Sequence, residues 1–298
     1  MLGVGFGVAV LVGNTIGSGI LRTPGEVAGR LPSPVLFLAV WMAGGIYALL
    51  GSNALAEVSS MTRESGGYTV FVRRGLGPYF GFVAGWSDWV SSCTSATAAA
   101  FVVGESFQFL SGSAPSVIVP CAVGVLLAFT LIQWRGVQSA SWTQQLTSFL
   151  KALAFLLFVA ICFGRGSASA PPATPPTVTG GVPLLVAWIL AMQAVIFTFD
   201  GWIGPAYFAG ELRDPGRELP RSIFAGVIAV IVIYLLFNLA LLHVLPIAKL
   251  ANDPFAAASA MATLFGTRGD LIVHGLVILS LLSAINAYLM LPRARSMR

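Results

Sequence analysis

The chain has 298 residues, and its composition is that of a membrane protein. Strongly apolar residues make up 57% of it, glycine adds 33 residues, and charged residues are only 9%, against roughly 25% in a typical soluble domain. A soluble fold with so few charges would lack the ionic surface that keeps proteins dispersed. The same figures exclude intrinsic disorder, which needs low hydrophobicity and high charge. Three cysteines are too few for a disulfide scaffold.

The cysteines, histidines and basic residues indicate no metal or nucleic-acid site. Cys93, Cys121 and Cys162 lie in apolar stretches at wide spacing, so we interpret them as small buried apolar residues. His243 and His274 have no nearby Asp or Cys to complete a ligand set, and we interpret them as helix-packing or helix-end residues. The formal charge of +5 forms no dense basic patch. We therefore expect no metal, no cofactor and no nucleic acid partner.

Eight segments are long and apolar enough to cross, as helices, a hydrocarbon layer about 30 Å thick. In chain order they lie at about 3–29, 33–58, 79–110, 116–134, 142–163, 183–210, 220–245 and 270–291. None alternates with the period of two typical of barrel strands. The sequence therefore predicts an all-α polytopic membrane protein. The first segment has no basic stretch before it, so we interpret it as part of the fold and not as a signal peptide.

The loops between these segments indicate how the chain is organised. A stretch rich in glycine, serine and proline at 164–182 separates residues 1–163, with five predicted spans, from residues 183–298, with three. Cytoplasmic loops carry an excess of Lys and Arg. Ten basic residues lie on one side (Arg63, Arg73, Arg74, Arg135, Arg213, Arg217, Arg221, Arg293, Arg295, Arg298) and five on the other (Arg22, Arg30, Arg165, Lys249, Arg268). This bias predicts that both termini are cytoplasmic and that the 164–182 linker is extracytoplasmic.

The first predicted span contains a weak point for a helix. Residues 12–20 read Val-Gly-Asn-Thr-Ile-Gly-Ser-Gly-Ile in the middle of the apolar segment. Each glycine costs about 1 kcal/mol of helix propensity relative to alanine, and the polar side chains compete for backbone hydrogen bonds. Gly13 and Gly17 also match the G-x-x-x-G motif, so close helix packing is the alternative interpretation.

The predicted span at 183–210 has a corresponding weak point. Between Phe197 and Pro205 the chain carries Asp200, two glycines and the proline, which removes a backbone donor and clashes with the preceding turn. Interrupted spans at corresponding places of two halves are typical of a transporter binding site. There the exposed N–H groups of a half-helix can hold a carboxylate, and freed carbonyl groups can receive an ammonium.

Two ionisable residues lie at membrane depth. A lysine such as Lys151, near the middle of its span, costs about 2.5 to 3.5 kcal/mol there and is functional by default. The alternative interpretation is a structural ammonium bonded to backbone carbonyl groups. Both interpretations hold if the lysine locks the broken first span when it is protonated and releases it when it is not. Asp200 has two interpretations. It is either a partner for a substrate ammonium, a proton or Lys151, or a cap that accepts N–H bonds from the broken turn. Asp88 and Glu105 lie near the ends of their span, and we interpret them as interface residues.

Three motifs resemble those of the amino acid, polyamine and organocation (APC) superfamily, in particular its amino acid permeases. The first is Gly-Asn-Thr-Ile-Gly-Ser-Gly-Ile at 13–20. The second runs from Ser-Gly-Gly-Tyr at 65–68 to Gly85-Trp86, and the third runs from Phe197 to Arg221. The resemblance implies a five-plus-five inverted repeat with broken helices 1 and 6. Because the chain ends after its eighth span, the second repeat is expected to be incomplete.

The resemblance also implies a substrate site between the two breaks. By family similarity its substrate-binding residues would be Ile16, Gly17, Ser18, Gly19, Phe197, Phe199, Asp200, Gly201, Ser283 and Asn286. Residues around Cys93 to Thr97 would line the same pocket. Lys151 matches a lysine whose ammonium replaces a sodium ion of sodium-coupled relatives, which implies coupling to protons or exchange.

The predicted function is therefore secondary active transport of amino acids across the cell membrane by alternating access. The alternatives are a non-transporting amino acid-binding protein or sensor, and a transporter of polyamines or other organocations. The predicted pocket is small and largely apolar, which favours neutral amino acids, although Asp200 keeps cationic substrates open. We do not expect an enzyme, because the sequence has neither an H-E-x-x-H nor a G-x-S-x-G pattern.

Overall fold

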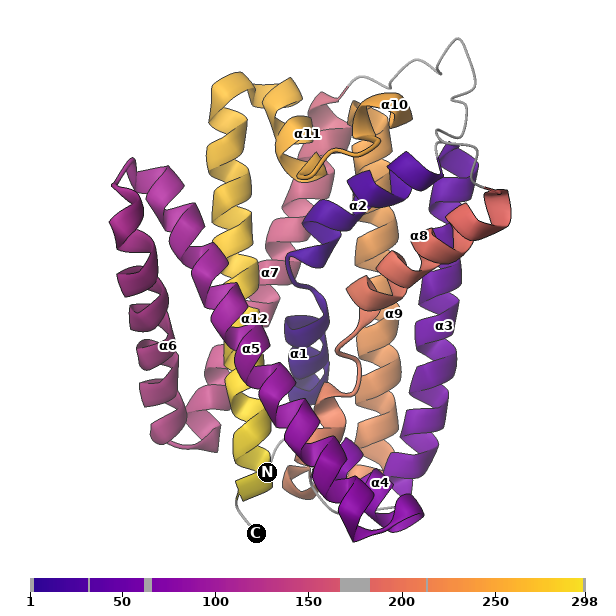
Figure 1. Ribbon diagram of the computed structural model, residues 1–298, viewed down its shortest axis with the longest axis vertical. Helices are drawn as coiled ribbons and strands as arrows, with labels where there is room; N and C mark the ends of the chain where they lie inside the picture. The colour runs from indigo at the N-terminus through magenta and orange to yellow at the C-terminus, as the bar shows by residue number, and fades with distance from the viewer. Residues whose placement is uncertain (1–2, 32, 62–65, 167–182, 213, 297–298) are drawn as a thin grey trace.

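The computed structural model describes residues 3–31, 33–61, 66–166, 183–212 and 214–296. The regular elements of these residues are all helices (Figure 1). In chain order they are α1 (Val4–Thr15), α2 (Gly19–Arg30), α3 (Pro34–Ser60), α4 (Tyr68–Leu76), α5 (Pro78–Ser111), η1 (Pro115–Val117), α6 (Ile118–Trp134), α7 (Val137–Arg165), α8 (Leu184–Phe199), η2 (Gly204–Glu211), α9 (Pro215–Val244), α10 (Ile247–Leu250), α11 (Ala256–Phe265), η3 (Gly266–Arg268) and α12 (Gly269–Ser296). The predicted linker at 164–182 lies outside the described residues from residue 167 onward.

Seven of the eight predicted spans meet the requirements of length and apolar character. Among the described residues six helical segments meet them alone, and the pair α1 and α2, bent by 50°, meets them as one broken span. The eighth prediction, 79–110, corresponds to α5. This helix has 34 residues, which at about 1.5 Å per residue exceeds the hydrocarbon thickness. Helix α5 is too polar to meet the requirement of apolar character, because a run of serines and threonines interrupts its apolar residues.

Helix α1 lies at the centre of the bundle, where α7, α9 and α12 pack around it (Figure 1). Its sequence is apolar on all sides, and most of its residues are buried, as expected for a helix without a polar face. Helix α3 packs on α8 and α9, and α5 crosses the bundle obliquely and packs on α12, α6 and α4. Helix α6 is the least buried of the candidate membrane-spanning helices among the described residues, with only 11% of its most apolar stretch buried. Its apolar side chains therefore suit contact with lipid.

The two ends of the bundle differ. The first and last described residues lie at the same end of the bundle as α4, whereas α2, α10 and α11 cover the opposite end (Figure 1). Asn252, next to α10, has a φ of 60° and donates its backbone N–H to the carbonyl of Gly25 in α2 at 2.8 Å. This connection ties α2 to the segment between α9 and α11.

The structure corrects the prediction for the cysteines and confirms that for the histidines. Only Cys162 is buried, whereas Cys121 is half-buried and Cys93 is exposed, because an apolar residue of a membrane helix can face lipid as well as the core. His243 contacts the backbone oxygen of Gly166 at 3.2 Å near the end of α9. His274 stacks on Phe109 with ring centroids 4.1 Å apart and packs α12 against α5.

Candidate substrate-binding site

The first predicted break is present, between α1 and α2. Helix α1 ends at Thr15, Ile16 has an extended backbone, and α2 begins at Gly19. The last carbonyl groups of a helix have no partner within it, so a break inside the bundle exposes several of them. The first N–H groups of α2 have no acceptor in their own helix for the same reason.

Side chains of three other helices donate hydrogen bonds to these carbonyl groups. The Lys151 ammonium of α7, fully buried, donates to the backbone oxygens of Gly13 and Ile16 at 2.9 and 2.6 Å. The Ile16 oxygen also accepts a bond from Ser280 of α12 at 3.1 Å. The hydroxyl of Tyr234, in α9, lies 2.9 Å from the backbone oxygen of Thr15. Lys151 therefore bridges to the broken first span, as its position in the sequence predicts.

The second predicted break lies between α8 and η2. Helix α8 ends at Phe199, and Asp200 is extended and accepts the N–H of Gly201 on its own side chain at 2.9 Å. Gly201 has a φ of 116°, a conformation that only glycine adopts without strain. The chain then continues as the 3₁₀ helix η2, whose second residue is Pro205.

The two breaks are in direct contact. The Asn14 side chain donates from Nδ2 to the backbone oxygen of Gly201 at 3.1 Å. A Cβ at Gly201 would lie 2.9 Å from the backbone nitrogen of Thr15, so this glycine lets the two backbones approach. Further out, the hydroxyl of Thr198 donates to that of Thr23 in α2 at 2.9 Å. The two interruptions, separated by more than 180 residues, form one irregular region at the centre of the bundle.

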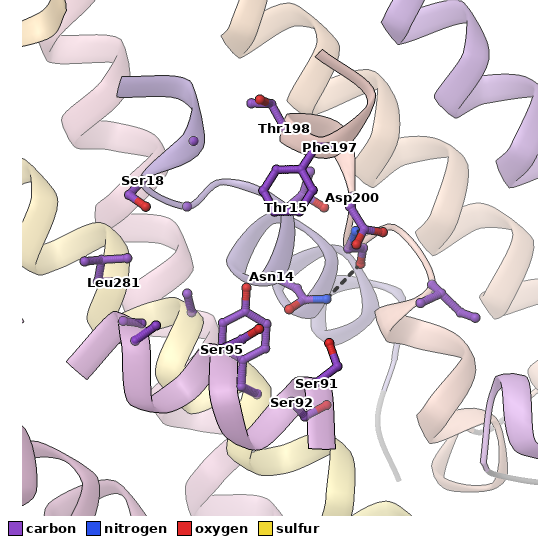
Figure 2. A pocket seen from close by; sticks show the side chains of 18 of the residues that line it. Asn14, Thr15, Ser18, Ser91, Ser92, Ser95, Phe197, Thr198, Asp200 and Leu281 are labelled. Atoms are coloured by element: carbon purple, nitrogen blue, oxygen red, sulfur yellow. Dashed lines mark hydrogen bonds between the residues drawn. The ribbon is translucent and has the colours of Figure 1, made fainter. Parts of the chain in front are cut away.

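A cavity of about 390 Å³ opens beside this region. It is lined by both breaks and by α4, α5 and α12 (Figure 2). The lining residues are Asn14, Thr15, Gly17, Ser18, Gly19, Tyr68, Asp88, Ser91, Ser92, Ser95, Ala98, Ala99, Val102, Phe197, Thr198, Asp200, Gly201, Ile203, Tyr207, Leu281, Ala284 and Tyr288. More than half of them carry a polar side chain, and apolar residues such as Ala98, Ala99 and Val102 also line the cavity. Its volume is within the range of small-molecule sites.

The two sides of the cavity favour ligand groups of opposite charge. The N-terminal end of α2 faces the cavity at Gly17, Ser18 and Gly19. The first N–H groups of a helix and its dipole favour a negative group at such an end. Asp200 contributes a carboxylate on the opposite break. Partial burial, followed by the negative charges of Asp200 and Asp88, raises the pKa of Tyr68 in α4 to about 12, so its hydroxyl stays protonated and can donate.

Six of the ten predicted substrate-binding residues line the cavity: Gly17, Ser18, Gly19, Phe197, Asp200 and Gly201. The Phe197 side chain is 78% exposed. Two others support the breaks from behind. The Ile16 side chain is fully buried while its carbonyl binds Lys151, and Phe199 packs against Trp41 and Tyr234.

The structure does not bring the last two, Ser283 and Asn286, to the cavity. Both are fully buried in a polar cluster behind α1. Ser283 lies 3.1 Å from the Ser148 hydroxyl, and Asn286 donates to the Gln144 side chain at 2.8 Å. The cavity-facing residues of α12 are Leu281, Ala284 and Tyr288. Their spacing of three and four residues marks one helix face, so Ser283 and Asn286 fall on another.

The predicted pocket segment of α5 is correct in place but displaced in register. Ser95 lines the cavity, whereas Cys93 and Thr97 are exposed on the outer face of the helix. Asp88, interpreted from the sequence as an interface residue, lines the cavity and accepts the Tyr207 hydroxyl of η2. Hydroxyl-bearing residues occur on more than one face of α5, since Thr97 is exposed outside the cavity and Ser95 lines it, so their spacing alone did not identify the face.

Asn14 and Thr15 line the cavity as well, although the sequence interpretation assigned no contact to them. Both flank the first break, and the Asn14 Oδ1 and Thr15 Oγ1 atoms are buried without a hydrogen-bond partner among the described residues. They lie inside the Gly-Asn-Thr-Ile-Gly-Ser-Gly-Ile motif, so the polar residues preceding the first glycine of the break were the available signal.

Comparison with known proteins assigns the family. A family profile described as "Amino acid permease" matches residues 6–294, nearly the whole chain. The chain belongs to the amino acid permease family. Together with its apolar helices, this membership makes it a multi-pass membrane protein of the APC superfamily with that superfamily's all-α fold.

Relatives of this chain are transporters by name. The serine/threonine exchanger SteT of Bacillus subtilis is 26% identical over 287 residues, which are 96% of this chain and 64% of the relative. The b(0,+)-type amino acid transporter 1 of Mus musculus is 28% identical, over 88% of this chain and 54% of the relative. The polyamine transporter PUT1 of Oryza sativa subsp. japonica is 27% identical, over 71% and 45%. The chain thus spans between 45% and 64% of the length of these relatives.

Proposed function

We propose that this permease carries out secondary transport of amino acids by alternating access, with its substrate held between the two breaks. The observation that carries the proposal is that one cavity contains both the N-terminal end of α2 and the carboxylate of Asp200. An amino acid has the complementary pair, a carboxylate and an ammonium on one carbon. Membership of the amino acid permease family supports the proposal, as do relatives named as amino acid transporters.

The two ends of the substrate's backbone have distinct partners in this proposal. Its carboxylate accepts hydrogen bonds from the N–H groups at Gly17, Ser18 and Gly19, where the dipole of α2 adds to the attraction. Its ammonium pairs with Asp200. Phe197 covers the bound molecule, and Ile16, Phe199, Ser283 and Asn286 hold the surrounding backbone in place without contact to the substrate.

Lys151 is the proposed coupling residue. It contacts the α1 side of the first break, at Gly13 within the last turn of the helix and at Ile16 directly after it. The charged ammonium bonds these carbonyl groups more strongly than a neutral amine would. Loss of its proton would therefore loosen the break, and this links the position of α2 to a proton. Coupling to protons or exchange of one amino acid for another are the two modes that fit.

The proposed setting is the cell membrane, with both termini cytoplasmic, and residues 1–163 and 183–298 form the two repeats, the second with three spans. The inward excess of basic loop residues supports this orientation. The common end of the first and last described residues is consistent with it (Figure 1). Hydrogen bonding and positioning are the only tasks that the site residues have in this mechanism, so no catalytic residue is assigned.

Two measurements test the proposal. Purified protein in lipid nanodiscs is screened for thermal stabilisation by each common amino acid, and proteoliposomes are assayed for uptake and exchange of those that bind. We expect at least one amino acid to bind, Asp200→Asn to weaken that binding, and Lys151→Ala to reduce the pH dependence of flux. Glu105→Gln, an exposed carboxylate of α5 outside the cavity, is the matched control. Absence of binding across the panel would contradict the proposal, and binding without flux would indicate a sensor.

A polyamine is the second candidate substrate. The described cavity lining contains the carboxylates of Asp88 and Asp200 and neither lysine nor arginine, and one relative is named as a polyamine transporter. Putrescine and spermidine therefore belong in the same binding screen. Preference for them over every amino acid would favour this alternative.

A further inference from the structure

Helix α5 presents a hydroxyl-rich face to the cavity. Ser91, Ser92 and Ser95 lie within four residues of one another and all line the cavity, and Figure 2 shows them on α5 facing Asn14 of α1. The Ser92 hydroxyl donates to the backbone oxygen of Asp88 at 2.8 Å. The hydroxyls of Ser91 and Ser95 have no hydrogen bond to another residue that the structure describes, so both are available to a ligand.

The facing wall offers a fixed acceptor. Because Asn14 Nδ2 donates to Gly201, the amide orientation is set, and Oδ1 is the atom that remains. This oxygen has no donor among the described residues, although Asn14 is only 9% exposed. The hydroxyl of the neighbouring Thr15, 6% exposed, is likewise without a partner. Buried polar atoms in proteins are normally hydrogen-bonded, so these atoms point to a ligand that pairs with them.

We propose that Asn14, Thr15, Ser91 and Ser95 form a subsite for the substrate's side chain, and that it selects amino acids carrying a hydroxyl or carboxamide group. This inference rests on the proposed function, in which the backbone of the substrate is held at α2 and Asp200. A hydroxyl or amide can donate to Asn14 Oδ1 and accept from a serine at once. An aliphatic side chain of equal size would leave the buried Asn14 Oδ1 and Thr15 hydroxyl unpaired.

The subsite's chemistry gives selectivity against isosteric substrates. A site built to hydrogen-bond a substrate hydroxyl rejects the analogue without it strongly, because its own buried polar groups lose their partners. Threonine and valine have nearly the same shape and differ by that one group. Apolar lining at Ala98, Ala99 and Val102 gives the subsite a wall for the carbon atoms of such a side chain.

The test compares matched ligands on matched variants. Dissociation constants for threonine, valine, serine, alanine and glycine are measured with the purified full chain in nanodiscs. We expect threonine to bind at least about tenfold tighter than valine. The double variant Ser91→Ala/Ser95→Ala should lower this ratio by about threefold or more and leave glycine, which has no side chain, unchanged. Ser87→Ala, an exposed α5 residue outside the cavity, should leave all ratios unchanged.

Three results would overturn the inference. Valine binding as tightly as threonine would show that the subsite does not select a polar group. An equal loss in the ratio with Ser87→Ala would show that the effect of the double variant is not local. Preference for lysine or putrescine over threonine would assign the cavity to cations. Failure of every amino acid to bind contradicts the proposed function itself, which distinguishes that failure from a loss of the side-chain preference alone.

Discussion

The two breaks solve the same backbone problem in different ways. At the first, the exposed carbonyl groups of α1 are paired by side chains of α7, α9 and α12, among them Lys151 and Tyr234. At the second, Asp200 caps the next residue of its own chain, and Gly201 is held by Asn14 from the first break. Asn14, Thr15 and Ile16 at the first break are buried, whereas Phe197 and Asp200 at the second are exposed.

This difference indicates which break is fixed and which can move. A segment bonded to three neighbouring helices resists displacement unless several contacts break together. The course of the chain at the second break depends on one glycine, and Phe197 and Asp200 there already face the cavity. We expect the first break to form the stable reference surface for the substrate, and the second to supply the parts that adjust around it. The following predictions measure this contrast, from the largest expected change in stability to the smallest.

Lys151→Met should have the largest effect. The substitution removes both hydrogen bonds to Gly13 and Ile16, and bonds to a charged donor are each worth about 1.5 to 3 kcal/mol. We expect the free energy of unfolding in detergent to fall by about 3 kcal/mol or more. Lys249→Met, at an exposed lysine, is the matched control. Equal stability of the two variants would mean that Lys151 does not hold the first break.

Gly201→Ala should be the next largest. The residue has a φ of 116°, and a Cβ there would contact the Thr15 backbone at 2.9 Å. Strain of this kind costs about 1 to 3 kcal/mol, which thermal denaturation in detergent measures. Gly124→Ala in α6, where a Cβ meets no neighbour within 4 Å, should be neutral or stabilising. A neutral Gly201→Ala would show that the two breaks separate readily.

Tyr234→Phe removes only a hydroxyl. That group lies 2.9 Å from the backbone oxygen of Thr15 and 3.0 Å from that of Thr198, and so connects both breaks. Loss of one buried hydrogen bond lowers the free energy of unfolding by about 1 kcal/mol, measurable by chemical denaturation. Tyr79→Phe, at a tyrosine that is 72% exposed, should change it little. An effect no larger than that of the control would exclude a connecting role.

Asp200→Asn should have the smallest effect on stability. An asparagine oxygen can still accept the Gly201 N–H, so we expect a change within about 0.5 kcal/mol. Amino acid binding should nevertheless fall at least about fivefold, because a charge-assisted hydrogen bond is stronger than a neutral one. Thermal stabilisation by the best ligand measures this fall. Unchanged binding would place the substrate ammonium elsewhere.

Local chemistry was the reliable part of prediction from sequence. Three glycines with Asn, Thr and Ser in one apolar span, and an Asp-Gly pair before a proline in another, weaken a helix wherever it packs, and both breaks lie where these residues stand. Which face of an unbroken helix points to the cavity was less predictable from the sequence. In α12 and α5 polar residues occur on more than one face, so the pattern could not show that Ser283 and Asn286 point to a buried cluster and Ser91 to the cavity.

The sequence by itself determined that lipid surrounds the chain, that the fold is all-helical and where the two breaks lie. These follow from apolar content and backbone propensity along the chain. The charge content of 9% identifies lipid as the surroundings, and the position of Lys151 inside an apolar span singled out the residue that bonds to the first break. Only the tertiary structure decided which groups meet. Contacts such as Asn14 with Gly201, or Asp88 with Tyr207, join residues more than 100 positions apart. Such contacts depend on helix rotation and packing, which no local pattern records.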